Sequence, residues 1–359
     1  MCDNRGMPFS PLFSISIETA SALTTIERAR GFLEAAALSQ DWVSKMQKRA
    51  FALEAHHTTH IEGTHLNLEQ SQKLIAGESV DGVDAEDVKE LLNYRTAFDF
   101  VAEYVLSQGA ITESFIREIH KRLVNGVRGN SARPGQYRTA QNYIANSITK
   151  EIIYTPPPHF EVPVLMAELI EWLQNVYTTP SAIPPVLVAG IAQFQLVHIH
   201  PFMDGNGRTS RLLSTLCLYR SGYDFKKLFT ISEYYDRDRQ DYYNALQSVR
   251  NNAMDMTKWL EYFTKALATQ MHEIQRKGIQ AINLDGIVAT YQLSSRQKYA
   301  LEQLIEKGGF LTIHEYESLC PGIHRRTLQR DLLDMVEKGI IIQEGTKKTT
   351  RYRIHEKTI

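Results

Sequence analysis

The sequence has little cysteine, almost no net charge and no long apolar run. Its 359 residues include three cysteines, Cys2, Cys217 and Cys320, an odd number at distant positions. Such spacing excludes a disulfide framework or a cysteine-based metal site, and it is typical of reduced thiols. The formal net charge of −1 gives no global indication of a nucleic-acid or membrane partner.

Targeting and membrane segments are not recognisable either. Residues 1–14 lack a basic stretch followed by an apolar core, and no apolar run reaches the roughly eighteen residues of a membrane helix. We therefore expect a cytoplasmic protein without membrane contact. Hydrophobic residues make up 43% and charged residues 23%, which is an ordinary globular composition, and the length suggests two domains.

The most informative stretch is the polar loop at 198–211, which lies between two apolar runs. This pattern predicts helix, loop, helix. Pro201 should end the first helix near His200, and two glycines allow the loop to turn tightly. The second helix should begin near Gly207 or Arg208, with unpaired amides and the positive end of its dipole facing the loop. Such a helix start binds phosphate readily.

The side chains of this loop suit a polyphosphate and a metal ion. Arg208 and Arg211 share a helix face, so they can hold successive phosphates. Asp204 is a hard oxygen ligand suited to Mg²⁺, and His200 could take a proton from an attacking hydroxyl. Phe202 should point inward. The alternative is a glycine-rich turn with a surface histidine, but this combination within twelve residues favours a phosphate site.

Residues 200–211, HPFMDGNGRTSR, resemble the complete signature loop of the Fic family, H-x-F-x-D/E-G-N-G-R-x-x-R. The resemblance implies a mainly α fold and protein AMPylation, in which AMP moves from ATP to a Ser, Thr or Tyr hydroxyl of a target protein and pyrophosphate is released. It also implies Mg²⁺ as cofactor. Relatives that phosphorylate carry Lys at the position of Gly207, so the glycine favours nucleotidyl transfer.

The resemblance also implies a role for each residue of the loop. His200 would be the general base and Asp204 the Mg²⁺ ligand. The residues implied to contact ATP are Asp204, Gly205, Asn206, Gly207, Arg208, Thr209, Ser210 and Arg211, with the Gly205–Gly207 segment as anion hole and the two arginines at the β- and γ-phosphates.

A second short motif, THIEG at 59–63 preceded by Thr58, follows a helical stretch at 42–57. A helix C-terminus closed by Gly63 is the simplest interpretation, but it leaves unexplained an acid, Glu62, at the negative end of the dipole. The segment resembles the Fic inhibitory motif, S/T-x-x-x-E-G/N. The resemblance implies that Glu62 pairs with Arg211, takes the place of the ATP γ-phosphate and inhibits the enzyme. In some relatives this glutamate also assists removal of AMP from the target.

A hairpin is predicted by two β-prone segments, 142–145 and 151–155, around the turn 146–150. It could be a surface hairpin that only joins helices. With the preceding segment 133–138 and the prolines at 156–158, it resembles the Fic flap, which implies that a target protein binds there by strand addition. Its second strand would also wall the nucleotide pocket, through Ile152, Ile153 and Tyr154.

Two interpretations are open for the neighbouring tyrosines Tyr242 and Tyr243. Aromatic core packing is one interpretation of this pair, while the family resemblance places both rings against the adenine and ribose of ATP. The helix that carries Trp259 and Phe263 should end near Gly278.

The pattern changes after residue 283. Helices at 296–307, 313–319 and 324–338 and two strands around a polar wing resemble a winged helix-turn-helix domain. Its basic residues could contact DNA: Arg325, Arg326, Arg330, Lys347, Lys348 and Arg351. However, residues 291–359 hold twelve Lys and Arg against nine Asp and Glu, and winged helices also bind proteins.

We therefore expect three parts: an N-terminal helical region with the inhibitory motif (1–110), a Fic catalytic core (111–282) and a winged-helix domain (283–359). The expected function is an AMPylator inhibited by its own Glu62. Two alternatives stay open, a DNA-binding regulator whose Fic domain senses nucleotide and a de-AMPylase that uses the same site. Self-modification and homodimer formation are also open.

Overall fold

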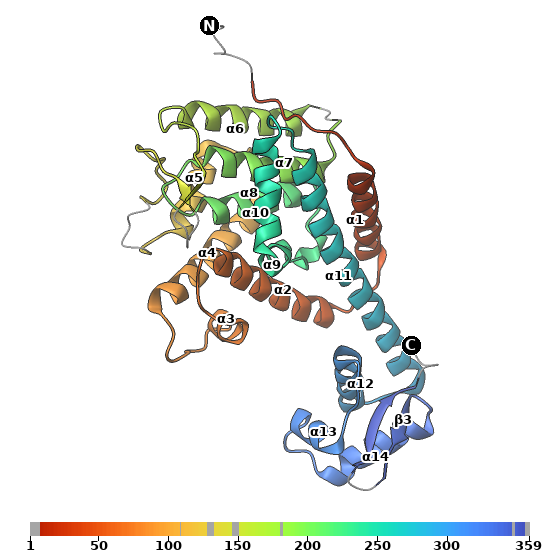
Figure 1. The fold of residues 1–359 in the computed structure, drawn as a ribbon. Coiled ribbons are helices and arrows are strands. Elements are labelled where there is room, and N and C mark those ends of the chain that lie inside the picture. The colour runs from red at the N-terminus through yellow and green to blue at the C-terminus, as the bar shows by residue number, and fades with distance from the viewer. Residues whose placement is uncertain are drawn as a thin grey trace. The chain divides into compact units, whose positions relative to one another are not determined.

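The structure, a computed structural model, describes residues 8–107, 109–127, 133–145, 151–179, 182–346 and 349–355. The predicted hairpin turn at 146–150 and the predicted DNA contacts Lys347 and Lys348 lie outside these residues. The fold is mainly helical, as the sequence predicts (Figure 1). The described residues form two compact units, one of residues up to Ala35 with Val43–Ile274, the other of Ala36–Trp42 with Gln275 onward.

The helices from α1 to α11, the last of which continues into the second unit, come in this order: α1 (Ile17–Ala35), α2 (Gln40–Ile61), α3 (Leu68–Ile75), α4 (Ala85–Leu106), α5 (Glu113–Leu123), α6 (Val162–Thr178), α7 (Pro185–Ile199), α8 (Asn206–Arg220), the 3₁₀ turn η2 (Phe225–Lys227), α9 (Ile231–Arg237), α10 (Arg239–Asn251) and α11 (Thr257–Tyr291). The predicted hairpin is present, with β1 (Ile144–Ala145) antiparallel to β2 (Ile152–Tyr154).

Helices α7 and α8 lie at the centre of the first unit, with α6 beside α7 and both α4 and α5 beside α8 (Figure 1). Helix α7 is buried almost throughout, because its sequence is apolar on all sides. At Gly190 a methyl group would come within 2.9 Å of Leu260 on α11. The Trp259 indole also donates to the Gly190 carbonyl at 2.8 Å. The glycine therefore allows α11 to pack closely against α7.

The loop between α7 and α8 begins and ends in the left-handed backbone region. Helix α7 ends at Ile199, and His200 has φ 52° and ψ 57°. This end agrees with the prediction from Pro201. Helix α8 begins at Asn206, one residue before the predicted start, after Gly205 with φ 76°. Glycine adopts this conformation without the steric cost that a β-carbon would bring.

Two predicted helix ends are wrong. Helix α2 continues through Thr58 to Ile61. Helix α11 does not end near Gly278 but runs to Tyr291. Its last turns remain helical because Leu284 is buried in the core of the second unit, with Ile287 and Val288 packed against that core. Tertiary burial thus outweighs the helix-breaking tendency of a glycine.

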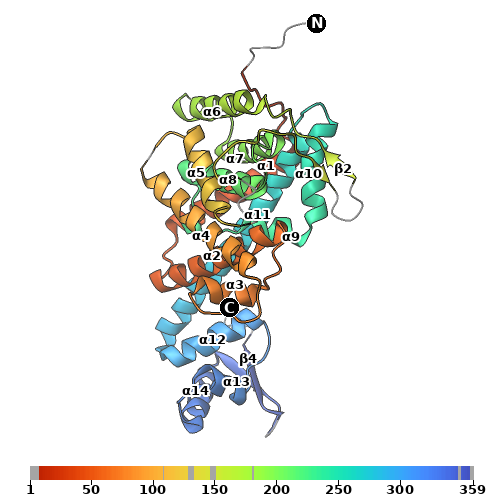
Figure 2. The ribbon, with the colours of Figure 1, turned by 90° about the vertical axis from the view of Figure 1, so that its left-hand side faces the viewer.

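The second unit has the element order that the sequence predicts (Figure 2). It contains α12 (Ser295–Lys307), α13 (Ile313–Leu319), α14 (Arg325–Glu337) and the antiparallel strands β3 (Ile341–Glu344) and β4 (Arg351–Ile354). Ser294 and Thr312 form capping boxes at the starts of α12 and α13. In the described part of the chain, no helix is both long enough and apolar enough to cross a membrane.

Candidate active site

The loop between α7 and α8 is fixed from inside and from outside. Its own Asn206 side chain accepts from the Phe202 amide and donates to the Phe202 carbonyl, both at 2.9 Å. From α5, the fully buried His120 ring stacks on Phe202 at 3.7 Å between centroids. His120 Nδ1 accepts from the Gly135 amide, so Nε2 carries the proton that is donated to the Asp204 carbonyl at 3.0 Å. Phe202 is fully buried, as predicted.

Arg138 closes the C-terminal end of α7. Its Nε donates to the His200 carbonyl at 2.8 Å, and its backbone amide donates to Pro201 at 2.9 Å. The same guanidinium donates to the Pro157 carbonyl beyond the hairpin. A cation at this position satisfies carbonyls that have no intrahelical partner and complements the helix dipole. Arg138 thereby fixes the backbone from which the His200 ring projects.

The His200 imidazole is held as a neutral ring. Its Nδ1 lies 3.3 Å from the Val197 carbonyl, an acceptor, so the proton belongs on Nδ1 and Nε2 keeps its lone pair. Burial lowers the pKa of His200 to about 4; the positive charges of Arg250 and Arg138 also lower it, while Val197 and Glu62 act in the opposite direction. The ring can therefore accept a proton at neutral pH.

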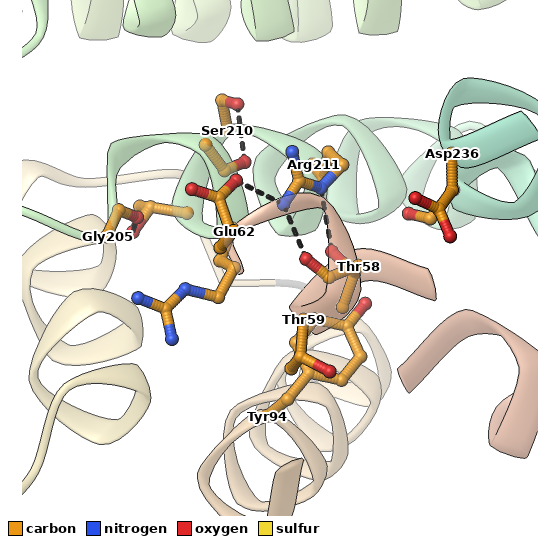
Figure 3. A network of polar contacts seen from close by, with 12 residues as sticks. Thr58, Thr59, Glu62, Tyr94, Gly205, Ser210, Arg211 and Asp236 are labelled. Atoms are coloured by element: carbon orange, nitrogen blue, oxygen red, sulfur yellow. Dashed lines mark hydrogen bonds and ion pairs between the residues drawn. The ribbon is translucent and has the colours of Figure 1, made fainter. Parts of the chain in front are cut away.

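The two arginines of the signature sequence, Arg208 and Arg211, lie on α8 and are buried. Each pairs with a carboxylate outside α8. Arg208 is 0% exposed, and its Nη1 donates to Glu90 of α4 at 2.6 Å. Arg211 donates from Nε to the Thr58 hydroxyl at 2.7 Å and from Nη2 to the Thr58 carbonyl at 3.0 Å (Figure 3). Its Nη2 also contacts Glu62 Oε1 at 2.7 Å, the pair that the sequence predicts.

The Glu62 carboxylate lies against the first turn of α8. A β-carbon added at Gly207 would come within 2.2 Å of Glu62 Oε1. Gly63, with φ 105°, turns the chain away directly after this residue. The carboxylate thus occupies space beside the backbone that begins α8, where anions are favoured by the helix dipole (Figure 3).

The remaining polar side chains of the loop have partners within it. Thr209 donates its hydroxyl to the Gly205 carbonyl and Ser210 to the Gly207 carbonyl, each at 2.8 Å, and both residues are buried. They stabilise the first turn of α8. The Thr209 backbone amide also donates to the Gly205 carbonyl, at 3.0 Å, so the amides of α8 without an intrahelical partner are those of the residues before Thr209.

Asp204 fits one part of a magnesium site. Its Oδ1 accepts from the Gly205 amide at 2.7 Å, and its side chain is 29% exposed. Across the described residues, no group of three or more His, Cys, Asp or Glu side chains could hold a metal ion. One accessible carboxylate suits Mg²⁺ that arrives with nucleotide phosphates, because this ion needs few protein ligands.

The second strand of the hairpin is attached next to His200. The Tyr154 hydroxyl donates to the His198 carbonyl at 2.8 Å and accepts from His198 Nδ1 at 2.9 Å. The guanidinium of Arg250 covers the Tyr154 ring at 3.4 Å from its centroid. Ile152 and Ile153, by contrast, are 58% and 50% exposed. The strand therefore has one fixed end and two accessible apolar side chains.

The two tyrosines of α10 lie in different environments. Tyr242 is 2% exposed and stacks on Tyr235 at 4.5 Å between ring centroids. Tyr243 is 47% exposed. Tyr242 thus belongs to the aromatic core, whereas Tyr243 offers an accessible ring to a ligand.

Sequence analysis gave no role to several residues that shape this site. No sequence motif marks His120, which lies beneath the loop and supports it through Phe202 and the Asp204 carbonyl. Glu90, His198 and Arg250 were not singled out, because each acts through a partner far away in the chain. Arg138 lies in a segment that resembles the Fic family, which was the one available signal.

Comparisons with known proteins agree with this arrangement. Residues 110–218 match the model of the Fic/DOC family. The chain is 31% identical over 202 residues to the protein adenylyltransferases Fic of Drosophila willistoni and Drosophila ananassae, a match that covers 56% of this chain. It spans only 38% of the length of those relatives.

Solved structures share the fold. A Fic family protein from Desulfovibrio desulfuricans G20 matches with a TM-score of 0.65 and 23% identity, over 97% of this chain and 99% of that one. Fic-1 from C. elegans matches with a TM-score of 0.60 and 24% identity, over 74% of this chain and 73% of that one. The match at 110–218, which includes the signature loop, shows that this part of the chain is a Fic/DOC family domain.

Proposed function

We propose that the chain is a protein adenylyltransferase that moves AMP from ATP to a hydroxyl group of a target protein. The observation that carries the proposal is the neutral His200 ring beside a helix start with two buried arginines. The names of the Drosophila relatives point to the same activity. Positioning and charge neutralisation would supply most of the rate enhancement.

The chemistry follows from the donors and acceptors at the loop. His200 Nε2 takes the proton of the target hydroxyl, whose oxygen forms a bond to the α-phosphorus. The bond between the α-phosphorus and the bridging oxygen breaks, and pyrophosphate leaves. The α8 start and Arg211 hold the phosphates, and Asp204 would hold Mg²⁺, which neutralises charge on them when bound.

We further propose that Glu62 inhibits this reaction. Its carboxylate pairs with Arg211 and lies against Gly207, in space that the terminal phosphate of ATP needs. A carboxylate and a phosphate cannot both be favourable there, since like charges repel at short distance. ATP would bind productively only after Glu62 moves away.

The test uses the purified chain, α-labelled ATP and Mg²⁺, with lysate proteins as acceptors. We expect weak labelling of protein by the wild type, strong labelling by Glu62→Gly and none by Glu62→Gly/His200→Ala. If Glu62→Gly labels neither itself nor lysate proteins, AMP transfer is not the function. A de-AMPylase would instead release AMP from a prelabelled target and lose this activity in Glu62→Gly.

A DNA-binding regulator remains the alternative from another class. Arg325, Arg326 and Arg330 are exposed at the start of α14, although Arg325 also pairs with Glu317 at 2.9 Å. DNA binding that weakens steeply with salt, in a protein without AMP transfer, would favour this alternative.

A further inference from the structure

A cavity of about 710 Å³ lies away from the phosphate loop, among α2, α3, α4, α8 and the residues around η2. Of the residues that the structure describes, none between 198 and 211 lines it. Its volume falls within the range of roughly 300–1,000 Å³ typical of small-molecule sites. The reaction proposed above makes no use of this cavity.

The walls of the cavity are aromatic and aliphatic. Four rings form a continuous strip: Phe51 and Phe98 lie 5.1 Å apart between centroids, Phe98 and Tyr219 6.4 Å, and Tyr219 and Phe229 6.1 Å. Small side chains open the space between the helices at Ala50, Ala52, Ala76 and Ala102. Such walls favour an apolar ligand body, because its burial removes apolar surface from water.

Three polar side chains of the walls, those of Gln47, Glu54 and Thr215, have hydrogen-bond partners within the protein. The Gln47 amide donates to the Lys226 carbonyl at 2.8 Å, and the Thr215 hydroxyl donates to the Arg211 carbonyl at 3.0 Å. The Glu54 carboxylate accepts from the amide and hydroxyl of Ser232. The inner part of the cavity is therefore poorly suited to a sugar or a nucleotide, which would require free hydrogen-bonding groups.

The mouth of the cavity is positively charged. Four of its lining residues are exposed cations: Lys48, Arg49, Arg95 and Lys227. The one exposed acid among the lining residues is Asp99, 3.9 Å from Arg95. The excess of positive charge at the rim would attract an anionic head group.

We propose that this cavity binds an aliphatic carboxylate of the fatty-acid class. The hydrocarbon chain lies along the four aromatic rings, and the carboxylate faces Lys48 and Arg49 at the rim. Both features of the cavity are then used, since an apolar body fills the inner space and one negative charge meets the cations.

The test is isothermal titration calorimetry of the full chain with octanoate as the probe. Octylamine serves as the matched ligand, because it has the same chain length and the opposite charge. We expect saturable binding of one octanoate per chain and at least about tenfold weaker binding of octylamine, a difference of about 1.4 kcal/mol. Equal binding of the two ligands, or no binding of octanoate, would overturn the proposal.

Variants then locate the site. Lys48→Glu/Arg49→Glu should weaken octanoate binding at least about tenfold. Lys265→Glu changes an exposed lysine on α11 outside the cavity, so the affinity for octanoate should stay within about twofold of the wild type. Ala102→Trp should fill the cavity and abolish binding, and its far-ultraviolet circular dichroism checks the fold. Unchanged affinity in the double rim variant contradicts the proposal even if Ala102→Trp does not fold.

Discussion

At the residue scale, the protonation state of His200 decides when it can act as a base. Burial lowers its pKa to about 4, so the ring stays neutral well below pH 6.5. We expect the rate of AMP transfer by Glu62→Gly to change little between pH 7.5 and 5.5, measured as single turnovers with saturating ATP. Removal of Glu62 takes away one interaction that raises the pKa of His200, so the rate of the variant should not begin to fall at a higher pH. A loss of rate centred near pH 6.5 would contradict this assignment.

Thr58 is a second determinant of the Glu62–Arg211 pair, because its hydroxyl accepts from Arg211 Nε. Thr58→Val keeps the side-chain shape but leaves that buried donor without its acceptor, at a cost of about 1–3 kcal/mol. We expect a lower midpoint of thermal unfolding and more labelling than the wild type. The matched control is Thr59→Val, since the buried Thr59 hydroxyl donates only to carbonyls of its own helix, Ala55 and His56. Equal labelling by both variants would exclude a role of Thr58 in inhibition.

The two arginines show how far sequence reasoning reaches at this scale. The pairing of Glu62 with Arg211 could be predicted because both residues lie in recognisable motifs. The pairing of Arg208 with Glu90 could not, because nothing local marks a glutamate in the middle of the amphipathic α4. A buried ion pair depends on which helices meet, and that information is spread over the whole sequence.

At the element scale, helices with side-chain caps were predicted best. Helices α12 and α13 match the predicted ranges 296–307 and 313–319 to within one residue, since the Ser294 and Thr312 side chains cap their starts. Helices α2 and α11 extend beyond their predicted ends, because packing continues past the local signals. Glycine is a weak stop signal when the residues beyond it are apolar and buried.

The hairpin makes a testable connection between one element and the active site. The Tyr154 hydroxyl joins β2 to His198, two residues before His200. Tyr154→Phe removes both hydrogen bonds and should loosen the strand, and each bond contributes about 0.5–1.5 kcal/mol. We expect a several-fold higher KM for the target protein with a smaller change in kcat.

Tyr143→Phe is the matched control for this prediction. Tyr143 lies next to β1 and is 55% exposed. Loss of its hydroxyl should leave the steady-state labelling kinetics unchanged, since solvent replaces a partner at an exposed position. If both variants raise KM equally, the attachment of β2 to His198 is not what holds the strand in place.

At the scale of the whole molecule, the chain combines two units with separate cores. In the second unit, buried residues of α12–α14 and of strands β3 and β4 form one core cluster, which includes Leu301, Tyr316 and Leu332. The first unit contains the signature loop, the hairpin and Glu62. The proposed reaction and its proposed inhibition therefore need only residues of the first unit, while the second unit carries the exposed arginines of α14.

The first unit should be sensitive to acid. Burial lowers the pKa values of His56, His120, His198 and His200 to about 4. Unfolded histidines have a pKa near 6.5, so between pH 6.5 and 4 the unfolded chain binds protons that the folded chain does not. The free energy of unfolding must therefore fall as the pH is lowered through this range.

We expect the midpoint of thermal unfolding, followed by circular dichroism, to be several degrees lower at pH 5 than at pH 7. Each histidine that stays neutral in the fold contributes up to about 1.4 kcal/mol per pH unit in this range. His120→Gln removes one such group, so the difference between the two pH values should shrink even if the variant is less stable at pH 7. The same pH dependence in His120→Gln and the wild type would contradict this prediction. It would mean that the folded protein protonates His120 as readily as the unfolded chain does, although Nδ1 must keep its lone pair to accept from the Gly135 amide.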